Sequence, residues 1–171
     1  CPSRGLGDVY KRQLLIDNLD SFTRNIAEVV SSLGSNVVIA DGRKFDDVTV
    51  YNAVNELLLR TSPDRIILGP GPSRPESYPI TMELARRSVT GNLTIDGKQI
   101  PVLGLCLGHQ ALGLADGWKL VESPKGPVHG TPSMIISDGT GIFAGVPRES
   151  VMMRYNSCLL YTSPSPRDGH Q

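Results

Sequence analysis

The chain alternates short apolar runs with longer segments in which apolar residues recur at helical spacing. Four runs are apolar at consecutive positions, as strands buried on both faces are, and they cover residues 14–17, 36–40, 65–68 and 101–105. Amphipathic helices are predicted between them, over residues 22–33, 50–59 and 80–89. Strands that alternate with helices predict an α/β fold, a doubly wound, mostly parallel sheet with helices on both faces.

The first helix has the clearest boundary signals. Asp20 or Ser21 is expected to cap its N-terminus, and Gly34 follows its last turn as a C-terminal glycine. The face that packs against the sheet is predicted to carry five apolar side chains: Phe22, Ile26, Val29, Val30 and Leu33.

Beyond Trp118 the pattern changes to shorter strand-like pieces. They cover residues 118–121, 132–137 and 151–155, and no internal repeat is visible. A chain of 171 residues is long enough to bury a core and fits one domain.

The two ends differ in composition from the middle. Residues 1–13 and 158–171 are rich in Pro, Gly, Ser and Arg and have no strand or helix periodicity. Both resemble translated adaptor sequence, with ordinary disordered tails as the alternative. We therefore expect a domain over residues 14–157 that is cut at both ends. Three residues in these ends are then expected to carry no function: Cys1, Cys158 and His170.

Charge and cysteine usage exclude several classes of function. Seventeen Lys and Arg residues balance seventeen Asp and Glu residues, so no net field favours nucleic acid or an anionic membrane. No apolar run approaches the roughly 18 residues of a membrane-spanning helix. The three cysteines are widely spaced without a CxxC pair, which predicts no disulfide scaffold, no metal site and a reducing, cytoplasmic setting.

Cys106 is the strongest candidate for chemistry. It follows the fourth apolar run within Gly-Leu-Cys-Leu-Gly, the G-x-nucleophile-x-G pattern of a nucleophile elbow. Its flanking glycines allow a turn too tight for a Cβ atom, and the N-terminus of the following helix would favour the thiolate. The N–H of Leu107 would lie beside the sulfur as half of an oxyanion hole. On these residues alone, a buried structural cysteine is an equal alternative.

Two further segments are predicted to reach the same edge of the sheet. Ligands of doubly wound sheets bind beyond the carboxyl ends of the strands. Residues 17–21 (DNLDS) follow the first strand and residues 69–71 (GPG) follow the third. We therefore expect both segments to lie close to Cys106.

Four stretches, in order and spacing, resemble the class I glutamine amidotransferases: LLIDNLDSFTRNIAE, LGPGPSRPE, GLCLGHQALGLADG and RYNS. The resemblance covers residues 14–157 and implies a flavodoxin-like sheet that is incomplete at its C-terminus. The opening IDNLDSFTRN is most similar to the glutaminase subunit of anthranilate synthase and aminodeoxychorismate synthase. This branch implies glutamine as substrate and a chorismate-binding synthase component as partner, with no cofactor, nucleic acid or membrane.

The resemblance implies a role for each residue of two motifs. Cys106 would attack the side-chain amide carbon of glutamine, form a glutamyl thioester and release ammonia. The backbone N–H groups of Gly71 and Leu107 would stabilise the oxyanion. Gly69, Pro70 and Gly71 would form a rigid strap along the substrate.

Two more residues would hold the backbone end of the glutamine. Gln110 lies one helical turn beyond the nucleophile, and Ser157 would contact the same end through its main chain. Asn156 stands where the family usually has a histidine, which is a departure at that edge of the pocket. PSRPE after the glycine motif is a milder departure, and Gly71 is intact.

Other polar residues near these motifs have plainer interpretations. His109 is predicted to pack or hydrogen-bond rather than to act as the base, because its side chain points away from an elbow thiol. His129 is expected in a turn, either as a surface residue or as a contact with the synthase partner. Asp17, Asn18 and Asp20 are predicted to be turn and cap residues rather than catalytic ones. The resemblance implies that they shape the rim near the partner interface.

The catalytic histidine and glutamate of the resembled family come from an H-P-E-S-like segment, and none follows Ser157 here. We therefore expect these 171 residues alone to be inactive. One alternative is a non-catalytic glutamine-binding or regulatory subunit. Another is a glutaminase of a different pathway, which the DNLDSF opening disfavours.

Overall fold

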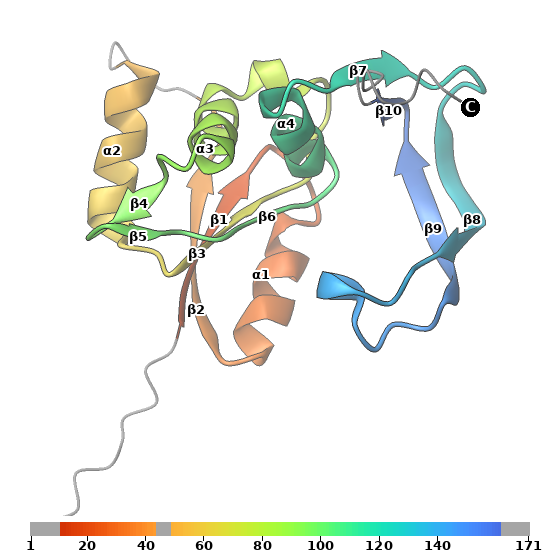
Figure 1. Cartoon of the computed structure of the whole chain (residues 1–171), viewed down its shortest axis with the longest axis horizontal. Coiled ribbons are helices and arrows are strands. Elements are labelled where there is room, and N and C mark those ends of the chain that lie inside the picture. Colours follow the sequence, from red (N-terminus) through yellow and green to blue (C-terminus); the bar gives the residue numbers. More distant parts are fainter. Residues whose placement is uncertain (1–10, 44–48, 162–171) are drawn as a thin grey trace, which may run out of the picture. The chain divides into compact units, whose positions relative to one another are not determined.

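The computed structural model describes residues 11–43 and 49–161, and the chain divides into two compact units. Unit 1 comprises Cys1–Trp118, and unit 2 comprises Lys119–Gln171. Figure 1 shows the helices and strands of both units, which are described separately below.

A four-stranded parallel sheet forms the centre of unit 1. Its strands lie in the order β2-β1-β3-β6 and cover Ser35–Asp41, Lys11–Asp17, Arg65–Leu68 and Val102–Gly104. Strand β1 pairs in parallel with β2 and β3, and β3 pairs in parallel with β6. The predicted parallel sheet is therefore confirmed, with all four strands within a few residues of their expected positions.

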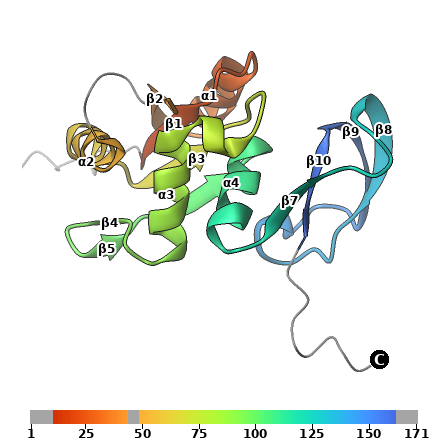
Figure 2. The same cartoon turned by 90° about the horizontal axis from the view of Figure 1, so that it is seen from above.

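Four α-helices cover this sheet: α1 (Thr23–Ser32), α2 (Val50–Thr61), α3 (Pro79–Val89) and α4 (Leu107–Ala115). Helix α1 lies on one face of the sheet, and α3 and α4 lie on the other (Figure 2). A short helical turn, η1 (Pro75–Ser77), precedes α3, and a hairpin of β4 (Thr94–Ile95) and β5 (Lys98–Gln99) precedes β6. Among the helices of the described residues, none is long and apolar enough to cross a membrane.

The core of unit 1 lies between the sheet and the helices of the α3 face. It is built from consecutive apolar residues of the strands and one apolar stripe of each helix. Its fully buried members include six side chains from both kinds of element: Leu14, Ile16, Leu68, Val54, Leu84 and Ala111. This packing holds β1, β3 and β6 side by side, so the loops at their carboxyl ends start from fixed positions.

Helix α1 departs from its expected packing. Its N-cap is Phe22, and no side chain caps it, so the expectation of an Asp20 or Ser21 cap is wrong. Asp20 instead accepts a hydrogen bond from the Phe22 N–H at 2.8 Å. Three of the five side chains of the predicted apolar face are largely exposed: Phe22, Val29 and Leu33. Gly34 does end the helix, with φ of 80°.

Unit 2 consists of two antiparallel strand pairs. Strand β7 (Lys119–Glu122) pairs with β10 (Cys158–Tyr161), and β8 (Val128–Ile136) pairs with β9 (Glu149–Asn156). A helical turn, η2 (Gly141–Phe143), lies in the connection from β8 to β9. The pair β8–β9 exposes large apolar side chains on both strands: Met134, Ile136, Val151, Met153 and Tyr155.

Strands extend into both ends that lacked strand periodicity. Strand β1 begins at Lys11, and β10 covers Cys158–Tyr161, so regular strands form at these positions although their sequence shows no strand periodicity. Backbone pairing with β2 and β7 supplies the order that the local pattern does not show. The domain boundaries at residues 14 and 157 remain a prediction, and Cys1 and His170 lie outside the described residues.

Candidate active site

The loops that follow β1, β3 and β6 define the candidate site. In Figure 1 the arrowheads of β1 and β2 point to the same edge of the sheet, and β3 and β6 run parallel to them. Beyond that edge the chain continues as Asp17–Asn18 after β1, as Gly69–Gly71 after β3 and as Cys106 after β6. The structure therefore brings together the three segments that the sequence predicted.

Cys106 occupies a turn of unusual backbone conformation. It is the N-cap residue of α4, with φ of 52° and ψ of −107°. A non-glycine residue rarely adopts a positive φ, and such strain persists where the surrounding structure imposes it. The N–H of Leu107 donates a hydrogen bond to the Cys106 sulfur, so it lies beside the thiol as expected, and its role as an oxyanion donor stays a prediction.

Close backbone contacts explain the glycines of this turn. A Cβ atom on Gly108 would lie 2.6 Å from both the carbonyl carbon and the Cβ of Leu68. A Cβ atom on Gly104 would lie 2.6 Å from the carbonyl oxygen of Gly108 and the nitrogen of His109. Real Cβ atoms do not approach other atoms so closely, so the predicted steric reason for the two glycines is confirmed.

The pKa of the Cys106 thiol is raised rather than lowered. Burial against surrounding protein atoms is the largest cause, and the negative charge of Asp20 adds to it, although the residue as a whole is exposed. The hydrogen bond from Leu107 acts in the opposite direction and lowers the pKa. The expectation that the elbow favours the thiolate is therefore wrong in net direction, because desolvation outweighs the N–H donor.

The strap Gly69–Gly71 is hydrogen-bonded to β1 and to the elbow. The Gly69 N–H donates to the Ile16 carbonyl at 3.0 Å, and the Gly69 carbonyl accepts from the Gly108 N–H at 3.2 Å. A Cβ on Gly71 would lie 2.5 Å from the Asn18 carbonyl oxygen, so only glycine fits there. Within the described part of the chain, the Gly71 N–H has no hydrogen-bond acceptor. It is therefore free to meet a ligand.

A tyrosine holds Pro72, the residue that directly follows the strap. The Tyr78 hydroxyl donates a hydrogen bond to the Pro72 carbonyl at 3.1 Å. Tyr78 is 3% exposed, and burial raises the pKa of its phenol, so it remains a donor at neutral pH. The strap is thus held at Gly69 and at the residue that follows it.

Asn18 has a structural role that the sequence did not reveal. The side chain is fully buried and donates from Nδ2 to the Gly69 carbonyl at 2.8 Å. Its neighbour Asp17 is the turn residue that was predicted, because it accepts from the Asp20 N–H and the Thr23 hydroxyl. An asparagine directly after a buried strand was the available signal, but turn propensity alone accounts equally well for it.

Gln110 and Ser157 lie in different units. Gln110 is half-buried on α4, one turn after Cys106, and its N–H donates to the Cys106 carbonyl at 3.0 Å. Ser157 follows β9 in unit 2, where its carbonyl accepts from the Ser123 N–H at 2.9 Å. The glutamine-binding roles of both residues stay predictions.

The position of His129 differs from the predicted one, and the role predicted for His109 is not tested. His109 is exposed on α4, and its role stays a prediction. His129 is not in a turn: it lies in β8, opposite Tyr155 of β9, next to an irregularity in the strand pairing. Its Nε2 atom is 3.2 Å from the Ser157 hydroxyl, and its ring stands edge-on to that of Tyr155. The Gly-Pro-Val-His-Gly sequence suggested a turn, but pairing with β9 extends the strand through it.

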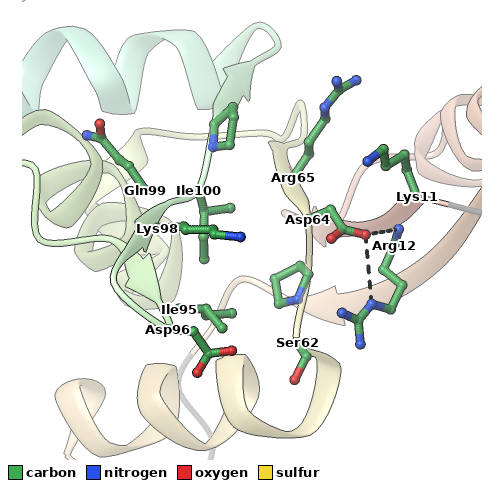
Figure 3. A pocket seen from close by; sticks show the side chains of 12 residues that line it. Lys11, Arg12, Ser62, Asp64, Arg65, Ile95, Asp96, Lys98, Gln99 and Ile100 are labelled. Carbon is green, nitrogen blue, oxygen red and sulfur yellow. Dashed lines mark hydrogen bonds and ion pairs between the residues drawn. The ribbon is translucent and has the colours of Figure 1, made fainter. Parts of the chain in front are cut away.

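A separate hollow of about 480 Å³ lies at the opposite edge of the sheet. Figure 3 shows its lining, which comes from the starts of β1 and β3, from the residues just before β3 and β6, and from the β4–β5 hairpin. Arg12 and Asp64 pair across one wall, with 2.8 Å from the Arg12 N–H to the carboxylate. The side chains that line this hollow carry both positive and negative charges. The hollow lies at the amino-terminal ends of the strands, whereas Cys106 lies beyond their carboxyl ends. Within residues 11–43 and 49–161, no group of His, Cys, Asp and Glu could hold a metal ion.

Comparison with known proteins identifies the family of the chain. A family model described as "Glutamine amidotransferase class-I" matches residues 14–168. Anthranilate synthase component 2 of Thermus thermophilus is 34% identical, over 92% of this chain and 69% of its own. Aminodeoxychorismate synthase component 2 of Escherichia coli is 33% identical, over 90% of this chain and 73% of its own. A bifunctional protein, TrpGD of Thermotoga maritima, is 36% identical, and the chain spans 25% of its length.

Solved structures share the fold. A putative GMP synthase protein from Thermoplasma acidophilum matches with a TM-score of 0.65 and 20% identity, over 88% of this chain and 67% of its own. A glutamine amidotransferase from Thermotoga maritima matches with a TM-score of 0.62 and 16% identity, over 88% of this chain and 62% of its own. At these identities the likeness concerns the fold alone.

Proposed function

Because the chain belongs to the class I glutamine amidotransferases, we propose that it is the glutaminase component of a chorismate-using synthase. Glutamine is its substrate, and the ammonia it releases passes to a chorismate-binding component that forms anthranilate or 4-amino-4-deoxychorismate. The names of the two component 2 relatives support this branch. The cysteine pattern supports a reducing compartment, and we propose the cytoplasm.

The position of Cys106 carries the proposal. Its thiol stands at the carboxyl edge of the sheet with the Leu107 N–H on its sulfur, and the Gly71 N–H has no acceptor among the described residues. These are the parts that acyl transfer requires: a nucleophile and two donors for the oxygen that becomes negative.

The reaction proceeds in two acyl transfers. The Cys106 sulfur attacks the side-chain amide carbon of glutamine, and the amide oxygen takes the negative charge while Gly71 and Leu107 donate to it. The C–N bond then breaks, the nitrogen takes up the proton that the thiol lost on attack, and ammonia leaves, so that a glutamyl thioester remains. Water attacks the thioester through a second oxyanion, and glutamate and the free thiol are released.

The other predicted residues bind rather than react. Gln110 holds the backbone end of glutamine, and Gly69 and Pro70 keep the strap against it. The raised pKa of the thiol fits this division of roles, because the thiol has to lose its proton to a base when substrate is bound.

Replacement of the nucleophile tests the proposal. In the full-length protein with its synthase partner, we expect Cys106→Ser to abolish glutamine-dependent synthesis, because a hydroxyl is far less acidic than a thiol. Synthesis from added ammonium should remain. Cys158→Ser is the matched control and should change neither activity. Loss of the ammonium-dependent reaction in Cys106→Ser would mean that Cys106 is structural.

We also infer that these 171 residues alone turn glutamine over slowly. Their three histidines, His109, His129 and His170, do not lie in an H-x-E sequence, so the segment offers no partner pair for the thiol. Unassisted proton transfer costs on the order of 10²–10⁴ in rate. Ammonia release within tenfold of that of a full-length homologue would contradict this inference.

The same observation favours a second candidate function, a non-catalytic glutamine-binding or regulatory subunit. The two candidates differ in the gene beyond Ser157, where an H-x-E sequence indicates the enzyme. They also differ in the Cys106→Ser experiment, because a regulatory subunit would retain its effect on the synthase.

A further inference from the structure

The carbonyl group of Gly69 is the point at which three segments of the site meet. It accepts one hydrogen bond from the Asn18 side chain at 2.8 Å and another from the Gly108 N–H at 3.2 Å. Gly69 belongs to the strap, Asn18 follows β1, and Gly108 is in the first turn of the helix that begins at the nucleophile. A change in the direction of this one carbonyl would therefore disturb both the strap and the elbow.

The Asn18 amide is itself held in one orientation. Its Oδ1 atom accepts a hydrogen bond from the Thr81 hydroxyl at 2.6 Å, and both residues are fully buried. Because Thr81 donates to Oδ1, the Nδ2 group is the end that faces Gly69. Gly42 packs against this pair, since a Cβ there would lie 2.8 Å from the Thr81 hydroxyl and would also overlap Asn18.

We propose that Asn18 is a positioning residue for the oxyanion donor of Gly71, held in place by Thr81. It fixes the peptide plane that begins the strap, and its own backbone lies against Gly71, so it sets both ends of the two-peptide segment that carries the donor. The inference rests on the proposed glutaminase reaction. It assigns to Asn18 a part in that reaction without contact with glutamine.

The chemistry of a buried amide explains why asparagine is needed. The Gly69 carbonyl requires a donor, and the Thr81 hydroxyl requires an acceptor; one amide supplies both. A carboxylate would place negative charge beside a carbonyl oxygen, and an apolar side chain would leave both partners unsatisfied in the interior. Either change removes the force that keeps the strap in one orientation.

The test measures two reactions of the same thiol. In the full-length protein with its synthase partner, Cys106 is labelled either with a diazo-ketone analogue of glutamine, which occupies the substrate site, or with iodoacetamide, which does not. For Asn18→Asp we expect the analogue reaction to slow and the iodoacetamide reaction to stay within threefold. For the turnover of glutamine we expect kcat to fall about 10- to 100-fold with little change in KM. This loss is smaller than the roughly 10²- to 10³-fold loss in kcat that follows deletion of an oxyanion donor.

A second variant tests the Thr81 hydrogen bond, and a matched control tests whether the chemical change itself has an effect. Thr81→Val keeps the shape of the side chain but removes its donor, and should lower kcat in the same way by a smaller factor. Asn52→Asp makes the same chemical change at an exposed position on α2 and should have no effect.

Two results would overturn the inference. Equal losses of both labelling reactions would mean that Asn18 supports the fold generally, and unchanged labelling and kcat would mean that the strap does not depend on it. Failure of the analogue to label Cys106 in the unaltered protein, while iodoacetamide does so, would instead overturn the proposed function.

Discussion

Two opposite effects act on the pKa of the Cys106 thiol. Burial and the charge of Asp20 raise its pKa, and the Leu107 N–H lowers it. A thiol that stays protonated in the empty site is protected from unspecific oxidation and alkylation, because the thiolate is the reactive form. The surrounding structure imposes the strained backbone of Cys106 and thereby holds the sulfur at a fixed position.

Removal of one charge should therefore increase the reactivity of this thiol. We expect Asp20→Asn to lower the pKa of Cys106, since the amide keeps the shape and the hydrogen-bond acceptor of Asp20 without its charge. The rate of iodoacetamide alkylation should rise at neutral pH and equal that of the unaltered protein well above the pKa. Asp96→Asn, at the other edge of the sheet, is the control. A pH–rate profile that is identical in all three proteins would contradict this assignment to Asp20.

At the scale of residues, sequence motifs predicted the turn at Cys106 and the glycine strap, but not the side chains that support them. Gly104 and Gly108 could be predicted from the elbow motif; the steric reason is local for Gly104, whereas Gly108 is packed against Leu68 of β3. Asn18 could not, because its partners Gly69 and Thr81 are 51 and 63 residues away in the chain. The expected direction of the Cys106 pKa shift was wrong for a related reason, because burial depends on packing between distant segments that no local sequence pattern shows.

Among the elements, α2 and α3 are joined by a buried arginine. The Arg87 guanidinium donates to Glu83 at 2.7 Å, to Asn55 at 2.7 Å and to the Tyr51 carbonyl at 3.1 Å, and it stacks on the Tyr51 ring. Its side chain is 7% exposed, whereas that of its neighbour Arg86, which binds the same Glu83, is 52% exposed. The two arginines thus differ in burial while sharing an acidic partner.

This difference predicts unequal effects on stability. We expect Arg87→Ala to lower the free energy of unfolding by about 2–4 kcal/mol, because the partly buried acceptors on α2 and α3 lose a buried donor. Arg86→Ala should have a much smaller effect, since water replaces an exposed ion pair readily. Denaturant unfolding of the two variants beside the unaltered protein measures both, and equal losses would contradict the central role of Arg87.

The elements of unit 1 were predictable where burial and periodicity coincide. Strand β3 lies at its expected residues, and α2 and α3 begin within one residue of theirs. Helix α1 shows the limit of the pattern, because an apolar stripe does not reveal which of its residues the sheet covers. The short hairpin β4–β5 was missed, since two-residue strands carry no periodicity.

At the scale of the whole molecule, the two units differ in how much core they contain. Unit 1 has a continuous cluster of buried apolar residues under its helices, whereas the β8–β9 pair of unit 2 leaves large apolar side chains exposed. A two-stranded pair without a covered face is marginally stable in water. The change of pattern after Trp118 indicated this transition, but strand pairing such as β7 with β10 is non-local and could not be derived from it.

Amide hydrogen exchange should show this difference directly. We expect the amides of β8 and β9 to exchange well before those of β1 and β3, because local opening is easier where few apolar contacts form. Mass-spectrometric peptide mapping of the 171-residue chain would measure both regions at once. Protection of β8–β9 equal to that of β1 would show that its apolar side chains are covered in solution.

The β4–β5 hairpin offers a place to attach the protein to other materials. Its two-residue turn, Asp96–Gly97, has positive φ at both positions, as in the tight turns that join antiparallel strands. It precedes β6, whereas Cys106 follows β6, so the two lie at opposite edges of the sheet. A fluorophore or an immobilising tag inserted at this turn would therefore be attached at the edge of the sheet opposite to the Cys106 thiol.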